Sequence, residues 1–457
     1  MDFLRGGAGN DTADYSGNFG SIIVDLAAGA GYWNYAEGDS LTGIENVTGT
    51  DFDDWLSGDA NANLLDGGAG NDSISGADGA DILHGGAGSD VLNGGAGIDT
   101  ADYSSNFGAV MVSLAAGVGA WNYAEGDSLI GIENLVGTSF NDILTGDAGT
   151  NLLHGGAGAD VLSGGAGVDT ADYAGDFGAV VVNLAAGVGA WNYAEGDSYS
   201  GIENVVGTSF NDVLQGDGAN NRLTGGGGAD TLAGGGGIDT VDYSANYGAV
   251  WVDLATGEGF WNDAEGDRFF GIENVQGSAW GDYLVGNGGT NALYGGGGND
   301  LLAGGAGADL LDGGAGNDTI DYTGNFGGVA ISLRAGQGSW NAAEGDSFVG
   351  IENVKGTSFN DILEGDANAN ILTGGGGEDL FVFGTGFGVD TISDFAGNGA
   401  ASGDRIQFGA GMFSGFADMM AHATQQGSDV VITLDAGNIL QLAGVQLNNL
   451  ASGDFLF

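Results

Sequence analysis

"GGAGNDSISGADGADILHGGAGSDVLNGGAGIDTAD" occupies Gly67–Asp102 and consists of four successive units of nine residues. Each unit has Gly at positions 1 and 4, usually Gly at position 2, Asp at position 6 and an apolar residue at position 8. Because glycine adopts backbone angles closed to other residues, the first six positions can turn tightly and expose their carbonyls. The last three are long enough for a short strand with one inward side chain. Each unit therefore predicts a turn followed by a strand.

The same unit recurs along most of the chain. Twelve copies match G-G-x-G-x-D strictly, in blocks that start at Gly49, Gly137, Gly207, Gly277 and Gly356, with an isolated copy at Gly6. Five inserts of equal length separate the blocks, at 15–48, 103–136, 173–206, 243–276 and 322–355. The last nine residues of an insert, such as "SLTGIENVT" at 40–48, again place Gly at 4, an acid at 6 and an apolar residue at 8. The constant length predicts structured inserts that continue the repeat.

The distances between blocks identify nine residues as the physical unit. D-T-x-D-Y sequences begin at Asp11, Asp99, Asp169, Asp239 and Asp318, so successive residue numbers differ by 88, 70, 70 and 79. The two longer intervals exceed 70 residues by 18 and by nine residues, which are whole numbers of nine-residue units. Two units make one coil with two strands and two turns, whose core we expect at Leu56, Leu65, Ile74, Leu83 and Leu92. The block 277–321 holds five units, an odd number. Its insert 322–355 is therefore predicted to leave the roll on the opposite side from the inserts at 103–136, 173–206 and 243–276.

Stacked coils place residues two units apart along one edge, which brings carboxylates together in pairs such as Asp72 with Asp90. Such carboxylates repel one another unless a hard cation with six to eight oxygen ligands lies between them. A merely solvated acidic face has no reason to keep Gly at positions 1 and 4. We therefore predict multiple Ca²⁺ ions, completed by turn carbonyls and held by Asp11, Asp54, Asp72, Asp81, Asp90, Asp99, Asp142, Asp160, Asp169, Asp212, Asp230, Asp239, Asp282, Asp300, Asp309, Asp318, Asp361 and Asp379.

The second unit of every block has Asn at position 6, at Asn63, Asn151, Asn221, Asn291 and Asn370. The inserts join the same edges, since Glu133, Asn151 and Asp169 also lie two units apart. Because an amide carries no charge, we expect the edges at these asparagines to bind calcium more weakly or to stay empty.

The composition excludes several functions. The 457 residues carry 62 Asp and Glu against six Lys and Arg, a formal charge of −56, which argues against nucleic acid and anionic membranes as partners. The chain contains no Cys, and no apolar run approaches the roughly 20 residues that span a bilayer. Neither H-E-x-x-H nor G-x-S-x-G occurs, and the three His are isolated. We therefore expect no enzyme activity within this chain and no membrane insertion.

"AWNYAEGDS" stands at Ala120–Ser128 and again at Ala190–Ser198, with close variants in the other three inserts. The acids of Glu-Gly-Asp could be general acid and base, calcium ligands or turn formers. A structural role is favoured because the loop accompanies every block. On that interpretation the tryptophans cover apolar core; these are Trp33, Trp121, Trp191, Trp261 and Trp340. The sharper alternative is a row of aromatic platforms that binds extracellular polysaccharide.

The two ends of the chain differ from the repeats. Residues 413–427 predict a helix with Phe416, Met419, Met420 and Ala423 on one face, and "DVVITLDAGNILQLAGV" predicts a hairpin. This C-terminal segment is expected to cap the solenoid, with an apolar outer face at Val445, Leu447, Leu450, Phe455 and Phe457.

No signal peptide is visible, and the chain starts in mid-repeat without a cap. It is therefore either the tail of a longer protein or an open end that meets a partner, for instance a second copy in an end-to-end or lateral homo-oligomer.

The tandem G-G-x-G-x-D-x-U-x units, where U is apolar, resemble the RTX proteins, which carry hemolysin-type calcium-binding repeats, over nearly the whole chain. The C-terminal region resembles that of serralysin-type proteases, and this resemblance implies type I secretion and an extracellular or cell-surface location. We expect an all-β, right-handed parallel β-roll or β-helix solenoid with a small helix-plus-hairpin cap. The array covers 1–382, with repeat blocks at 6–14, 49–102, 137–172, 207–242, 277–321 and 356–382, and the cap and secretion region covers 383–457.

The expected function is that of a secreted calcium-binding structural protein of the surface-layer, adhesin or filament type, which folds on binding extracellular calcium. One alternative is the calcium-dependent export and stability part of a larger secreted enzyme that acts on polysaccharide or protein. Another is a polysaccharide-binding module that uses the repeated Trp loops.

Overall fold

The structure, a computed structural model, describes residues 2–397 and 403–457. The chain forms two compact units, Met1–Gly237 and Ile238–Phe457. The sequence "AGNGAASGD" at 396–404 predicts a loop, and its residues 398–402 lie outside the described residues. Among the described residues, no helix is long and apolar enough to cross a membrane.

Each nonapeptide forms a strand of about three residues whose central side chain is buried. In the block 49–102, β7 (Trp55–Ser57), β9 (Ser73–Gly79) and β11 (Val91–Gly97) pair in parallel in one sheet. The intervening β8 (Leu64–Asp66), β10 (Ile82–His84) and β12 (Thr100–Asp102) pair in parallel in a second sheet. Partners lie two nonapeptides apart, as Leu56 opposite Ile74 and Leu65 opposite Leu83. The fold is therefore the predicted parallel β-roll, with two strands in each coil.

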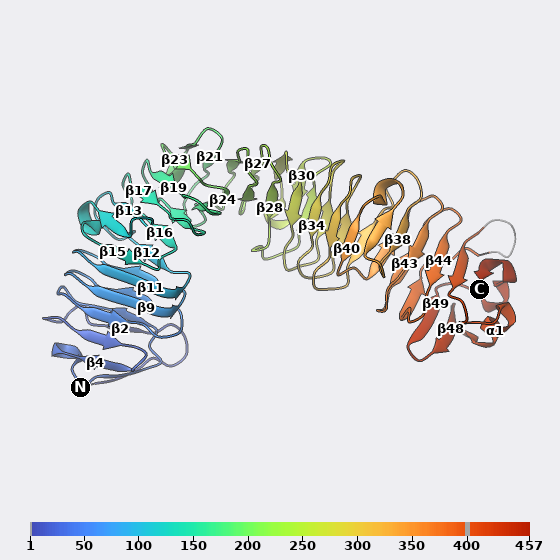
Figure 1. Cartoon of the computed structure of the whole chain (residues 1–457), viewed down its shortest axis with the longest axis horizontal. Helices are drawn as coiled ribbons and strands as arrows, with labels where there is room; N and C mark the ends of the chain where they lie inside the picture. Colours follow the sequence, from blue (N-terminus) through green and yellow to red (C-terminus); the bar gives the residue numbers. More distant parts are fainter. Residues whose placement is uncertain (1, 398–402) are drawn as a thin grey trace. The chain divides into compact units, whose positions relative to one another are not determined.

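The core lies between the two sheets. The five predicted core residues, Leu56, Leu65, Ile74, Leu83 and Leu92, are all buried. Figure 1 displays β9 and β11 as neighbouring rungs of the first unit. Because every coil of this block adds one apolar side chain from each sheet, its core is a narrow line of aliphatic residues between the sheets.

The inserts are additional strands of the same sheets. In the insert 103–136, β13 (Met111–Ser113), β14 (Val118–Ala120) and β15 (Ser128–Ile130) form an antiparallel meander. This meander lies between β11 on one side and β17 (Ile143–Thr145) on the other. Then β16 (Asn134–Val136) joins the second sheet between β12 and β18 (Leu152–His154). The prediction that an insert ends in a disguised nonapeptide is confirmed, and its first part lengthens one sheet only.

The side on which an insert leaves depends on the number of nonapeptides before it. In the second unit, the insert 243–276 contributes β29 (Trp251–Asp253) and β30 (Glu258–Phe260) to the sheet of β33 (Tyr283–Val285). After five nonapeptides, the insert 322–355 contributes β38 (Ala330–Ser332) and β39 (Gln337–Ser339) to the other sheet, beside β42 (Ile362–Glu364). The predicted inversion is confirmed for this pair. In the first unit all three inserts join the same sheet.

The C-terminal segment extends both sheets. β49 (Asn438–Leu442) pairs in parallel with β45 (Val389–Ile392), and β50 (Phe455–Leu456) pairs with β46 (Arg405–Phe408). The predicted hairpin is confirmed as β48 (Asp429–Asp435) with β49. The predicted helix over 413–427 is too long, because α1 covers only Phe416–Ala421 and β47 (Ala423–Gln426) pairs with β48. The predicted apolar outer face is also smaller than expected, since Leu450 and Phe455 are buried.

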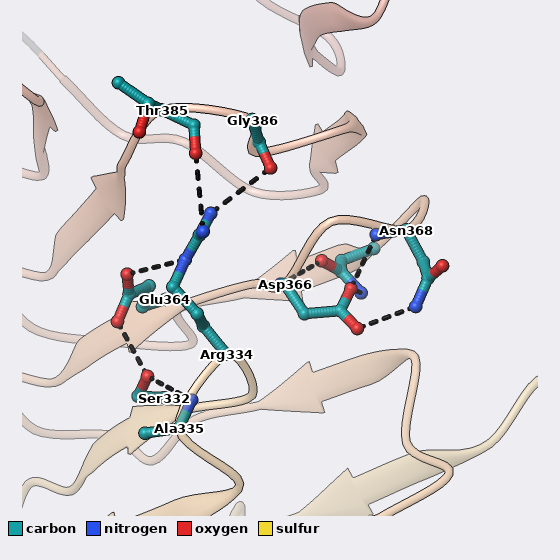
Figure 2. A network of polar contacts seen from close by, with 9 residues as sticks. Ser332, Arg334, Ala335, Glu364, Asp366, Asn368, Thr385 and Gly386 are labelled. Carbon is teal, nitrogen blue, oxygen red and sulfur yellow. Dashed lines mark hydrogen bonds and ion pairs between the residues drawn. The ribbon is translucent and has the colours of Figure 1, made fainter.

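Arg334 connects the last insert to the segment that follows the final repeat (Figure 2). Its Nε lies 3.3 Å from Oε1 of Glu364 on β42. The two terminal nitrogens donate to the carbonyls of Thr385 and Gly386, at 3.3 Å each. The equivalent position of the other inserts is Ala27, Ala115, Ala185 and Ala255. This contact is therefore specific to the C-terminal end of the roll.

Candidate metal-binding turns

The G-G-x-G-x-D turns need glycine at positions 2 and 4. In the turn 67–72, Gly68 has φ 95° and Gly70 has φ 125°, in the left-handed region. One coil further on, a side chain at Gly86 or Gly88 would overlap the carbonyl of Gly68 or Gly70. The glycines therefore let adjacent turns stack closely enough for their carbonyls to line one edge.

The aspartates at position 6 form the ladder that the spacing of two units predicts. Oδ1 of Asp72 accepts a hydrogen bond from the backbone N–H of Asp54 at 2.7 Å, and Oδ1 of Asp90 accepts from Asp72 at 2.8 Å. On the other edge, Oδ1 of Asp99 accepts from Asp81 at 2.9 Å. The corresponding bonds in later blocks join Asp142 to Asp160, Asp212 to Asp230, and Asp282 to Asp300. One oxygen of each carboxylate thus ties neighbouring coils together.

The second carboxylate oxygen is the unusual one. It is buried and accepts no hydrogen bond from any described residue at Asp11, Asp72, Asp81, Asp90, Asp99, Asp160, Asp169, Asp300, Asp309, Asp318 and Asp379. A methyl group at Gly67 would overlap Oδ2 of Asp72 and lie 2.8 Å from the carbonyl oxygen of Gly85 in the next coil. Carboxylate and carbonyl oxygens therefore face one small space without a donor between them. Asp230 and Asp239 are buried at the same position of equivalent turns.

Burial raises the pKa of several of these carboxyl groups. It raises the pKa of Asp72 and Asp160 to about 8, and that of Asp90, Asp300 and Asp379 to about 7. Neighbouring carboxylates add to the effect, as Asp90 and Asp54 do at Asp72. A buried anion without a counter-charge is costly, and a divalent cation would remove that cost.

Among residues 2–397 and 403–457, no three Asp, Glu or His side chains gather into one metal-binding cluster. A cation in these turns would therefore take most of its ligands from backbone carbonyls. Hard cations such as Ca²⁺ accept carbonyl oxygens together with carboxylates. The donor set fits calcium and offers neither nitrogen nor sulfur for a softer metal.

The first turn of each block is built differently. Thr138 donates from its backbone N–H to Oδ2 of Asp142 at 2.5 Å, and its hydroxyl lies 3.0 Å and 3.1 Å from the two carboxylate oxygens. The backbone N–H of Val110 donates to Oδ1 at 2.6 Å. The same arrangement, with Thr or Ser at position 2, encloses Asp54, Asp212, Asp282 and Asp361. Both oxygens of these five predicted ligands already accept protein donors.

The second turn of each block is also satisfied internally. Oδ1 of Asn63 accepts from the backbone N–H of Asp59 at 2.8 Å, and its Nδ2 donates to the carbonyl of Glu45 at 2.8 Å. Asn151 makes the same bonds with Asp147 and Glu133. An amide N–H therefore occupies the space that a cation would need, in keeping with the weak or empty edges expected at the asparagines.

The acids of the Glu-Gly-Asp loop belong to the scaffold. Oδ1 of Asp127 accepts from the backbone N–H of Asp90 at 2.9 Å, and its Oδ2 accepts from the hydroxyl of buried Tyr103 at 3.0 Å. Oε2 of Glu125 accepts from the N–H of Trp121 at 3.0 Å. Asp127 thus continues the aspartate ladder across the insert. Its departure from the regular spacing hid this role in the sequence, although the Asp-Thr-x-Asp-Tyr sequence at the start of every insert was a signal.

Two more acids extend the ladder into the C-terminal segment. Oδ1 of Asp390 accepts from Asn370 at 3.0 Å, and Oδ1 of Asp404 accepts from Asp379 at 3.0 Å. Oδ2 of Asp390 is buried and accepts no bond from a described residue. Both acids lie further along the chain from their partners than two nonapeptides, which explains why the repeat pattern missed them.

The prediction that the insert tryptophans cover apolar core is wrong. Trp33, Trp121, Trp191, Trp261 and Trp340 are between 42% and 57% exposed. In the insert 103–136 the apolar core positions are instead filled by Tyr103, Val110, Val112 and Leu135.

The repeats match a family model described as the RTX calcium-binding nonapeptide repeat (4 copies). The matched residues are 2–17, 40–74, 66–101, 136–171, 206–241, 271–321 and 355–390, together more than half of the chain. Among solved structures, the chain is similar to the extracellular lipase LipA from Serratia marcescens, at 18% sequence identity and a TM-score of 0.18. That similarity covers 69% of this chain and 40% of the lipase chain.

Proposed function

Because the chain belongs to the family of RTX calcium-binding nonapeptide repeats, we propose that it is a secreted structural protein, of the surface-layer, adhesin or filament type, which folds on binding extracellular calcium. The observation that carries this proposal is the line of buried carboxylate oxygens that accept no hydrogen bond from a described residue. With a formal charge of −56, the chain repels itself unless cations neutralise it.

Within this proposal, calcium lies in the turns with Gly or Ala at position 2. Its carboxylate ligands are Asp11, Asp72, Asp81, Asp90, Asp99, Asp160, Asp169, Asp230, Asp239, Asp300, Asp309, Asp318 and Asp379. The Thr and Ser turns and the Asn turns close without calcium, because their own donors occupy the acceptor oxygens. Each block then begins with two calcium-independent turns and ends with calcium-dependent ones.

The segment 383–457 is proposed as the cap and type I secretion region. Support comes from β49 and β50, which continue the two sheets, and from the resemblance of this segment to the C-terminal part of serralysin-type proteases. Extracellular calcium modules bind at about 10⁻⁴–10⁻³ M. Such an affinity keeps a chain unfolded where calcium is scarce and lets it fold after export.

Circular dichroism during a calcium titration tests the proposal. The chain in EGTA is expected to give the spectrum of an unfolded chain, and millimolar calcium is expected to produce a β-rich spectrum in one cooperative step. Magnesium at the same concentration is the control, because its demand for octahedral geometry suits these carbonyl-lined turns poorly. A β-rich spectrum that is unchanged in EGTA would sink the proposal.

A further inference from the structure

The Trp loops of the inserts hold a strained backbone. Trp33, Trp121, Trp191, Trp261 and Trp340 have φ between 65° and 71°, and the Asn that follows each has φ between 46° and 49°. Such angles disfavour a bulky side chain, and strained residues of this kind cluster at binding sites. Glycine would relieve the strain, yet every insert has Trp at this position.

Two hydrogen bonds fix each loop. In the second insert, Oε2 of Glu125 accepts from the N–H of Trp121 at 3.0 Å, and Nδ2 of Asn122 donates to the carbonyl of Ala109 at 2.6 Å. The same pair occurs in the other four inserts, at 2.9–3.0 Å and 2.5–2.6 Å. The half-exposed indole rings are thus carried by a rigid, repeated loop.

A second aromatic residue lies in the neighbouring loop of each insert. Phe19, Phe107, Phe177, Tyr247 and Phe326 are between 77% and 98% exposed. The side chain of Asn122 lies against Gly108, next in sequence to Phe107. In the third insert, Phe177 also contacts Phe210 of the following turn, edge to face at 5.1 Å between ring centroids. Each insert therefore presents several aromatic rings from adjacent loops.

The fourth insert adds a hollow of sugar-ring size. A cavity of about 220 Å³ is lined by Phe260, which precedes Trp261, and by Glu258, Glu265 and Arg268. Aromatic rings with a few convergent polar groups are typical of small-molecule sites. Hydroxyl groups can bond both to carboxylates and to a guanidinium, so this lining suits a polyol.

The three inserts of the first unit present their loops along one sheet, at intervals of five and six strands. From β14, the order of neighbouring strands is β13, β17, β19 (Val161–Ser163), β23 (Ser198–Ser200) and β22 (Val188–Ala190). Five strand steps correspond to about 24 Å between the loops of Trp121 and Trp191. By the same count, β14 and β4 (Ala30–Tyr32) are six steps apart, about 29 Å.

We propose that the loops of Trp33, Trp121 and Trp191 form a row of aromatic platforms that binds a neutral polysaccharide. Similar sites at comparable intervals match a long ligand that itself repeats. The charge of −56 disfavours a polyanion, whereas the apolar face of a neutral sugar ring can lie on an aromatic side chain. Several weak platforms on one long ligand reinforce one another through effective concentration.

Affinity electrophoresis in millimolar calcium tests this proposal, with laminarin, hydroxyethylcellulose and galactomannan as probes in the gel. At least one probe is expected to retard the full chain. Trp121→Ala should weaken the apparent affinity several-fold and Trp121→Phe should retain most of it. The triple change of Trp33, Trp121 and Trp191 to Ala should lower it by roughly two orders of magnitude, because multivalent binding is lost.

Trp55→Ala is the matched control, because Trp55 is an exposed Trp on β7 of the same sheet but outside the insert loops. It should leave retardation unchanged. Circular dichroism in calcium confirms that each variant is folded and tests the calcium-dependent fold separately. The proposal is overturned if none of the three probes retards the chain, if alginate alone retards it, or if the triple variant behaves like the unchanged chain. Self-association that requires the three Trp, seen by light scattering, would assign the row to a second copy instead.

Discussion

At the scale of single residues, the buried aspartates at position 6 are of two kinds, although the sequence pattern is the same. In one kind an oxygen accepts no hydrogen bond from a described residue, and in the other both oxygens accept protein donors. Asp160→Asn should reduce the number of calcium ions bound at saturation, because it removes a charged ligand. Asp142→Asn should leave that number unchanged, since its oxygens accept from Thr138 and Val110. The Asp142→Asn change should lower the free energy of unfolding of the calcium-loaded protein in urea by roughly 1–3 kcal/mol, because it leaves a buried polar group without a partner. Equilibrium dialysis with calcium and urea unfolding measure the two effects. Loss of bound calcium in Asp142→Asn would contradict the distinction.

Among the described turns, Ala77 is the one residue at position 2 that carries a side chain in the left-handed region, at φ 82°. Ala77→Gly should raise the stability of the calcium-loaded protein by about 1 kcal/mol, since the strain removed exceeds the added freedom of the unfolded chain. Ala87→Gly is the control, because Ala87 is at position 3 of the next coil and is not among the positive-φ residues. It should be neutral or slightly destabilising. Thermal unfolding of both variants in calcium decides, and equal shifts would refute the role of strain.

Much of the candidate site follows from spacing. The interval of two nonapeptides correctly predicted that Asp72 adjoins Asp54 and that Glu133 adjoins Asn151. It could not reveal which oxygens stay free, because that depends on the side chain at position 2: Thr50 supplies donors where Gly68 supplies none. The exposure of Trp121 was also hidden, since the recurrence of its loop beside every block favoured a structural role, whereas the side chain is 42% exposed.

At the scale of secondary-structure elements, Arg334 anchors the end of the roll to the loop at Thr385 and Gly386 (Figure 2). Arg334→Ala should speed hydrogen exchange in residues 384–388 and lower stability by about 1 kcal/mol, an amount limited by its partial exposure. Arg268→Ala is the control, because the ion pair of Arg268 with Glu258, at 3.6 Å, lies on the exposed surface. It should change exchange little. Unchanged exchange at 384–388 in Arg334→Ala would show that backbone pairing alone holds this loop.

The helix at the C-terminal end illustrates where local pattern fails. Phe416, Met419 and Met420 have helical spacing, and α1 forms there. The pattern continued to Ala423, but β47 pairs with β48 along Ala423–Gln426 instead. Strand pairing with a partner that follows directly in sequence outweighed the weak helix propensity of Thr424. The β-roll itself was predictable because each nonapeptide repeats the same local signal many times.

At the scale of the whole molecule, protons should partly replace calcium. An unfolded Asp has a pKa of about 3.9, whereas burial raises the pKa of Asp72 and Asp160 to about 8 and of Asp90 to about 7 in the calcium-free roll. Protonation of these carboxyl groups therefore favours the roll. This stabilisation is complete at a pH below the pKa of the unfolded chain. It is lost as the pH rises through the pKa values of about 7 to 8 in the folded roll. The chain in EGTA should gain β structure by circular dichroism between pH 8 and pH 5, with light scattering as a check for aggregation. A spectrum that becomes more ordered as the pH rises would contradict this sign.

The five nonapeptides between the last two inserts have a consequence for how such a chain can change. Adding or removing one unit of nine residues turns every later insert to the other sheet, while a change of two units only moves it along the axis. Whether the number of units between two inserts is odd or even therefore decides which sheet the later insert joins, independently of the length of the array. A single duplication can redirect a whole set of loops without altering one residue within them. Removing one unit from 277–321 would place the loops of Trp261 and Trp340 on a common face, where one extended ligand could reach both.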